Sequence, residues 1–425
     1  MKTQALVTRV TLLLCLAPWL AFPLQLPFQR PQKQHDTFHT PPHSSQSQLQ
    51  LQQQQYLTPY TTQWVNELQA VYNAFGEHKN DSRCPTEIET WTCQPYDLTE
   101  EDLVRPTDVW KLRPHDIKAV VSIGDSISAG FAMISGRPPF ATVLEYRGKV
   151  FSGGGDKGEY TLGNFLKTYG TGLQGSPSGV TLPLAHGKGL NTAVSGAIVQ
   201  NLPSQIERLK WQFGLLGPYH KYKKEWKLAT VFVGANNLCD ACSDGDKLPA
   251  VADPENYAAA LKDALIDLRD SIGPTFVNLV GIFDVSLVYE LSRGYPYCEM
   301  LFDKMPVPIC SCATSKVENR KRVGEVAEQY NDMMRKVAKE VNDESDSTSY
   351  GVVFQPGLTE FKDGSSPYGQ GYMSGLDCFH PNRCANQVMA ISLWNNMFSS
   401  ADGKDKPMKP DDLEIFCPGP TDYLK

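Results

Sequence analysis

The sequence has 425 residues, of which 41% are hydrophobic and 20% charged, a composition typical of a globular protein with a large core. The formal net charge is −7 and no long basic run is present. Nucleic-acid binding therefore has no electrostatic basis, and strong attraction to anionic membranes is not expected.

The N-terminal residues resemble a secretory signal. Lys2 and Arg9 precede an apolar stretch at 10–22, which Pro18 interrupts and Pro23 follows. This stretch is too short and too broken to span a bilayer. We expect a signal peptide at 1–22. No second apolar stretch of about 18 residues follows, so we expect a secreted, extracellular protein.

Three further segments complete the expected organisation. Residues 23–60 are rich in Gln, Ser, His and Pro and predict a disordered arm. Residues 61–83 contain apolar side chains at helical spacing and predict an N-terminal helix with a lead-in. The sequon Asn80-Asp81-Ser82 in this segment predicts a glycan. The main folded domain is expected at 84–425.

Strand and helix patterns alternate through that domain. Five apolar segments predict strands, at 117–123, 190–194, 228–233, 276–283 and 350–354. Apolar residues at helical spacing predict helices at 203–215, 256–272, 320–342 and 384–398. This alternation predicts an α/β fold with three layers, in which helices cover both faces of a parallel five-stranded sheet.

A serine follows the first of these strands. The run Gly124-Asp125-Ser126 begins where the apolar segment 117–123 ends. A serine on a sharp turn after a buried strand presents its hydroxyl at the edge of the sheet, as nucleophilic serines do in α/β enzymes. We expect Ser126 to be a nucleophile and Asp125 to cap the turn.

A base and its orienting acid occur near the C-terminal end. A serine hydroxyl needs a base with a pKa near neutrality, which is usually a histidine. The histidine in turn needs a carboxylate to fix its tautomer. Of eight histidines, only His380 has an acid, Asp377, at this spacing in a loop-like setting. His380 is therefore the candidate base and Asp377 its partner.

Small and amide residues follow the next two strands. Gly196 comes after 190–194, and Gly234, Asn236 and Asn237 come after 228–233. Open α/β sheets bind ligands at such strand ends. A tetrahedral oxyanion also needs hydrogen-bond donors there.

In order along the chain, these motifs match the four blocks of the SGNH (GDSL-type) hydrolases, which the sequence therefore resembles. The blocks are Gly124-Asp125-Ser126, Gly196, Gly234-x-Asn236 and Asp377-x-x-His380. Segments 111–118, 236–239 and 416–418 are similar to the phospholipase B branch. The resemblance covers roughly residues 84–425 and implies that they form the catalytic domain, present as a single copy.

The resemblance implies a flavodoxin-like fold and a role for each block. It implies Ser126 as nucleophile, His380 as base and Asp377 as the acid. The oxyanion hole would use the N–H groups of Ser126 and Gly196 and the amide of Asn236, with no metal and no cofactor. The family usually has Asp where Asn237 stands, so Asn237→Asp is expected to be tolerated.

The expected function is a secreted carboxylic ester hydrolase that cleaves phospholipids and lysophospholipids at a membrane or micelle surface. Apolar residues at 131, 133–134 and 138–140 follow the serine and favour an acyl chain. A short-chain or carbohydrate O-acyl esterase of the same fold is an alternative. A catalytically silent lipid-binding protein or an extracellular interaction protein is a further one. No nucleic-acid partner is expected.

Cysteine usage agrees with secretion. Apart from Cys15 in the signal, ten cysteines remain, which predicts up to five disulfides of open connectivity. A zinc site built from Cys239, Cys242, Cys310 and Cys312 is the alternative. Cys378 is expected to pair and so to brace His380.

Overall fold

The computed structural model describes residues 88–425 except 135, 137–142, 184, 186, 188, 243–246, 306–308, 358, 360–369 and 405–412. The expected signal peptide, disordered arm, N-terminal helix and sequon lie outside the described residues. So do residues 138–140 of the apolar segment after the serine.

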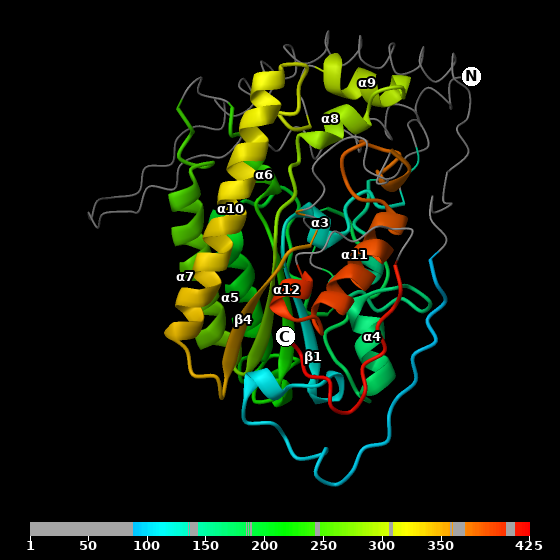
Figure 1. Ribbon diagram of the computed structural model, residues 1–425, viewed down its shortest axis with the longest axis vertical. Helices are drawn as coiled ribbons and strands as arrows, with labels where there is room; N and C mark the ends of the chain where they lie inside the picture. The colour runs from blue at the N-terminus through cyan, green and yellow to red at the C-terminus, as the bar shows by residue number, and fades with distance from the viewer. Residues whose placement is uncertain are drawn as a thin grey trace, which may run out of the picture.

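A parallel sheet forms the centre of the molecule (Figure 1). Its strands are β1 (Ala119–Gly124), β2 (Lys227–Phe232), β3 (Thr275–Val280) and β4 (Tyr350–Gln355), adjacent in that order and parallel throughout. Every residue of the first three strands is buried. Burial on both faces explains why these strands read as continuous apolar runs. Four of the five predicted strands are confirmed.

The fifth predicted strand, 190–194, pairs only briefly. Thr192 N–H donates to Ser122 O at 2.9 Å and Val194 N–H donates to Gly124 O at 3.1 Å, but the ladder is a single bridge. Gln174 pairs with Ala119 at the start of the same edge of β1, so two separate bridges stand in place of one longer ladder. The segment nevertheless lies beside β1 on the edge away from β2. The spatial order is therefore that of the flavodoxin-like folds, with a topological switch at β1.

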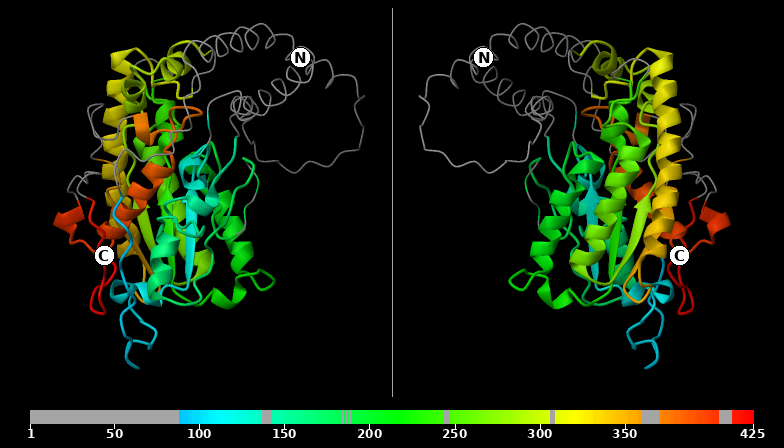
Figure 2. Two further views of the ribbon diagram at one scale, coloured as in Figure 1. Left: turned by 90° about the vertical axis from the view of Figure 1, so that its right-hand side faces the viewer. Right: turned by 90° about the vertical axis from the view of Figure 1, so that its left-hand side faces the viewer.

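Helices cover both faces, which confirms the three-layer prediction. Figures 1 and 2 show α5 (Leu202–Phe213), α7 (Pro254–Ile272) and α10 (Val317–Asp343) on one side of the sheet. On the other side lie α4 (Leu162–Tyr169) and α11 (Arg383–Asn396). All four helices predicted within the described residues are present, whereas α4 was not predicted.

Local sequence sets the limits of α7. The Asp253 carboxylate accepts from the N–H groups of Glu255 and Asn256, and Pro254 occupies the first turn. Gly273, at φ +84°, ends the helix. The predicted apolar face is fully buried, namely Tyr257, Leu261, Leu265 and Leu268.

Two short helices, α8 (Leu287–Leu291) and α9 (Pro296–Asp303), lie at the end of the molecule toward which the strands run (Figure 1). Neither was predicted, because each is too short to show a clear apolar period. Among the described helices, none combines the length and apolarity needed to cross a bilayer.

Disulfides join segments distant in sequence. The bonded pairs among described cysteines are Cys93–Cys417, Cys239–Cys310, Cys242–Cys312 and Cys298–Cys378. The zinc alternative is therefore wrong, because its four cysteines form two disulfides. The expectation that Cys378 is paired is confirmed.

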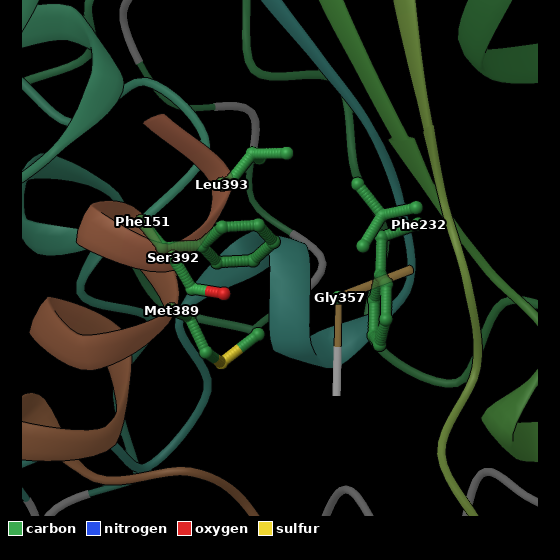
Figure 3. Close-up of a pocket in the computed structure, with 7 residues that line it drawn as sticks. Phe151, Phe232, Gly357, Met389, Ser392 and Leu393 are labelled. Atoms are coloured by element: carbon green, nitrogen blue, oxygen red, sulfur yellow. The ribbon is translucent and has the colours of Figure 1, made fainter. Parts of the chain in front are cut away.

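A small apolar cavity of about 10 Å³ lies between the sheet and α11 (Figure 3). Phe232 and Val280 line it from the strands, and Met389 and Ser392 from α11. The Ser392 hydroxyl is buried and has no hydrogen-bond partner among the described residues. The cavity has room for about one water-sized group and is far too small for an acyl chain.

We predict that two buried Ser→Ala substitutions affect the free energy of unfolding differently. Ser392→Ala removes an unpaired hydroxyl and should leave the free energy of unfolding unchanged or raise it by up to about 1 kcal/mol. Ser152→Ala removes the hydroxyl that bonds Ser122 Oγ at 2.8 Å and should lower it by about 1 kcal/mol. Urea denaturation of both variants measures the difference, and equal losses would contradict the prediction.

Candidate active site

A close backbone contact places Ser126. Gly124 ends β1 at φ +152°, and a Cβ there would lie 2.0 Å from Phe232 O of β2. Only glycine fits this approach. Asp125 then caps α3 (Ser126–Ala129), since its Oδ1 accepts from Ile127 N–H at 2.9 Å. The expected capping role of Asp125 is confirmed, and Ser126 begins the helix at the carboxyl edge of the sheet.

Hydrogen bonds join Ser126, His380 and Asp377. His380 Nε2 lies 2.7 Å from Ser126 Oγ, and His380 Nδ1 lies 2.6 Å from Asp377 Oδ2. An ionised carboxylate only accepts, so Nδ1 carries the hydrogen and Nε2 is free to accept from the serine. Asp377 is 1% exposed, whereas Ser126 and His380 retain 7% and 8%. Ser126 and His380 are therefore slightly more exposed than Asp377.

The environment of Asp377 favours its charged form. Burial opposes ionisation, but the facing His380 and its hydrogen bond outweigh it, and the pKa of Asp377 is lowered. Asp377 Oδ1 also accepts from the N–H groups of Phe379 and His380, both at 3.0 Å. Such bonds stabilise a carboxylate.

Asp125 is the opposite case. It is fully buried, and its Oδ2 has no partner among the described residues. Burial raises the pKa of Asp125 to about 7, although the Ile127 N–H bond and the nearby His380 oppose the shift.

Four contacts hold the loop that carries His380. Ser374 N–H donates to His380 O at 2.7 Å, and Ser374 Oγ donates to Ala132 O at 2.8 Å. The Cys298–Cys378 disulfide ties the loop to α9. The Phe131 ring packs on the His380 imidazole with ring centroids 4.8 Å apart. Ser374 was not predicted, because a serine in a polar loop carries no pattern that marks such a role.

The expected oxyanion donors lie on neighbouring strand ends. Gly196, at φ +83°, follows the segment beside β1, and Asn236 lies in the first turn of α6 (Ala235–Cys239) after β2. Asn236 Nδ2 donates to Ala197 O at 2.8 Å and so links the two loops. Within the described part of the chain, the N–H groups of Ser126 and Gly196 have no acceptor.

The Asn237 side chain also links these two loops. Its Oδ1 accepts from Val199 N–H at 3.1 Å, and its Nδ2 donates to Val251 O at 2.7 Å and Gln200 Oε1 at 3.2 Å. These partners fix the orientation of the amide. An aspartate could replace the acceptor but not the donor, which argues against the expectation that Asn237→Asp is tolerated.

A buried serine, histidine and aspartate joined in this order on an α/β sheet are typical of hydrolases that act through a serine. The family model for GDSL-like lipase/acylhydrolase matches residues 120–393. The chain therefore belongs to the GDSL-like lipase/acylhydrolase family, which confirms the expected enzyme class, a carboxylic ester hydrolase.

Curated relatives point to one branch of this family. The membrane-associated phospholipase B1 of Mus musculus is 29% identical over 327 residues, which is 74% of this chain and 21% of that protein. The Homo sapiens protein of the same name is 29% identical over 346 residues, 75% of this chain and 22% of its own length. The chain thus spans about a fifth of the relatives it matches. The predicted phospholipase B branch is confirmed.

A solved structure also matches. The acetylxylan esterase Axe2 from Geobacillus stearothermophilus aligns with a TM-score of 0.33 and 12% identity, over 67% of this chain and 96% of its own.

We predict that Asn237→Asp destabilises the protein. A carboxylate oxygen would face Val251 O, and the unpaired contact should lower the free energy of unfolding by about 1–3 kcal/mol at pH 8. The loss should shrink at pH 5, where a protonated carboxyl can donate to that carbonyl. Urea denaturation at both values measures this. Asn201→Asp is the matched control, because the exposed Asn201 side chain accepts from Ile198 N–H through Oδ1, as an aspartate can.

We predict that Asp125→Asn changes the pH dependence of stability. The folded pKa of Asp125 is about 7 and the unfolded value about 3.9. The folded state therefore binds more protons between these values, and the wild type should lose stability as pH rises from about 4 to about 7. The variant lacks this loss. Its stability relative to wild type should rise between pH 5 and pH 8 in urea denaturation, and a pH-independent difference would contradict the assignment.

Proposed function

We propose that the chain is a secreted serine ester hydrolase in which Ser126 is the nucleophile. The observation that carries this proposal is the chain of two hydrogen bonds through His380. Its Nε2 lies 2.7 Å from Ser126 Oγ and its Nδ1 lies 2.6 Å from Asp377 Oδ2. His380 Nε2 takes the hydroxyl proton as Ser126 Oγ attacks the ester carbonyl. The ionised Asp377 stabilises the resulting imidazolium.

The negative charge then develops on the carbonyl oxygen. The N–H groups of Ser126 and Gly196 and the Asn236 amide serve as its donors. This role is supported by the two N–H groups, which have no acceptor among the described residues. His380 protonates the leaving alcohol. Water, activated by the same histidine, releases the acid and restores Ser126.

The proposed substrates are fatty-acyl esters of phospholipids and lysophospholipids, presented at a membrane or micelle surface. The similarity to the phospholipase B1 proteins supports this choice. Phe131 and Met133 give no independent support, because both are buried in the core. The disulfides support the proposed extracellular location, since such bonds persist in oxidising compartments.

We predict that the oxidised full chain releases fatty acid from both diacyl- and lysophosphatidylcholine. Ser126→Ala should abolish this release without changing the urea denaturation midpoint. The panel also contains a short-chain nitrophenyl ester and an acetylated sugar. Turnover confined to these two esters would keep the serine mechanism and reject the lipid substrate. Full activity of Ser126→Ala would reject the mechanism.

A further inference from the structure

A buried ion pair lies beside the segment that leads to Gly196. Glu145 is fully buried and Arg147 is 2% exposed, with Arg147 Nη2 2.6 Å from Glu145 Oε2. The guanidinium also donates to Ala193 O at 2.9 Å and to Asn191 O at 3.1 Å. Arg147 therefore binds the backbone of the segment 190–194 at two carbonyls.

The other carboxylate oxygen of Glu145 accepts a hydrogen bond from Ser195. Ser195 Oγ donates to Glu145 Oε1 at 2.6 Å. A hydrogen bond to a buried carboxylate is among the stronger ones in proteins. Ser195, the residue immediately before Gly196, is thereby attached to the ion pair.

Ser195 and Gly196 form the centre of a tight turn. Ala197 N–H donates to Val194 O at 3.0 Å, Gly196 has φ +83°, and Ser195 is not among the described residues with positive φ. These features define a type II turn. In a type I turn the central peptide is rotated by roughly 150–170°. The turn type therefore decides toward which side the Gly196 N–H points.

The backbone around Glu145 is also hydrogen-bonded to the segment that follows Ser126. Tyr146 N–H donates to Gly130 O at 2.8 Å, and Ala132 N–H donates to Leu144 O at 2.9 Å. Asn191 Nδ2 donates to Ser128 O of α3 at 2.8 Å. One buried cluster thus fixes both the helix of Ser126 and the turn of Gly196.

We infer that Glu145, acting through Ser195, is a positioning residue that holds the Gly196 N–H toward the oxyanion. The inference rests on the proposed function, because it assigns a support to one of the proposed donors. Glu145 touches no substrate. Its effect is on the direction of a donor, and a donor misplaced by about 1 Å can cost a large part of its contribution to the rate.

The test uses Ser195→Ala in the full, oxidised chain, with the ester that the panel identifies. We expect kcat to fall about 10- to 100-fold while KM stays within about twofold. Ser195→Thr keeps the hydroxyl and should restore kcat. Ser204→Ala is the matched control, because Ser204 is exposed and its hydroxyl bonds only Asn201 O.

A second measurement separates positioning from general stability. Ser126 Oγ adds to the carbonyl carbon of an alkyl trifluoromethyl ketone, and its proton passes to His380. The oxygen of the resulting hemiketal carries the negative charge and lies in the proposed oxyanion hole. Its inhibition constant should rise in Ser195→Ala by about the same factor as kcat falls. Ser195→Cys, whose thiol is a weak donor, should show the same trend and serves if the alanine variant folds poorly.

Two results would overturn the inference while leaving the proposed function standing. One is wild-type kcat and inhibition in Ser195→Ala together with a large loss in Asn236→Ala. The other is a loss of kcat with unchanged inhibition by the ketone. Full activity of Ser126→Ala would instead reject the proposed function, and this inference with it.

Discussion

The contact between Gly124 and the Phe232 carbonyl determines where the site can form. With no Cβ on Gly124, β1 and β2 remain adjacent to their last residues, and the chain turns directly into Asp125 and Ser126. Asn236 follows the end of β2, the strand adjacent to β1. The segment before Gly196 lies along the other edge of β1. The switch point of the sheet thus brings three separate segments to one place.

The sheet alone does not orient the groups that these segments carry. Loops need buried polar links, because an irregular backbone is not held by a ladder. Ser374 and the Cys298–Cys378 disulfide supply these links for His380. Glu145 and Arg147 supply them for Gly196. Buried ion pairs are weak evidence for stability, so the value of this pair lies in the single geometry that it selects.

The sequence predicts what depends on local pattern. Continuous apolar runs identified four strands, and the spacing of Tyr257 to Leu268 identified the buried face of α7, since burial on a sheet imposes those patterns. Asp377 and His380 were found because they lie three residues apart, so that one turn of the chain can bring both side chains together. Glu145 was not found, since nothing local distinguishes a buried glutamate from an exposed one. The partners of each cysteine and of Asn237 depend on contacts between distant segments, which spacing does not encode.

Asp125 and Asp377 show how two buried carboxyls near one histidine acquire different properties. Asp377 faces the imidazole and accepts from two N–H groups, so its pKa falls despite burial. Asp125 accepts one such bond and has an unpaired oxygen, so burial dominates and its pKa rises to about 7. Environments that move two pKa values apart assign different roles to the same residue type. Asp377 is thereby suited to hold a permanent negative charge opposite His380. Asp125 caps the helix that begins at Ser126.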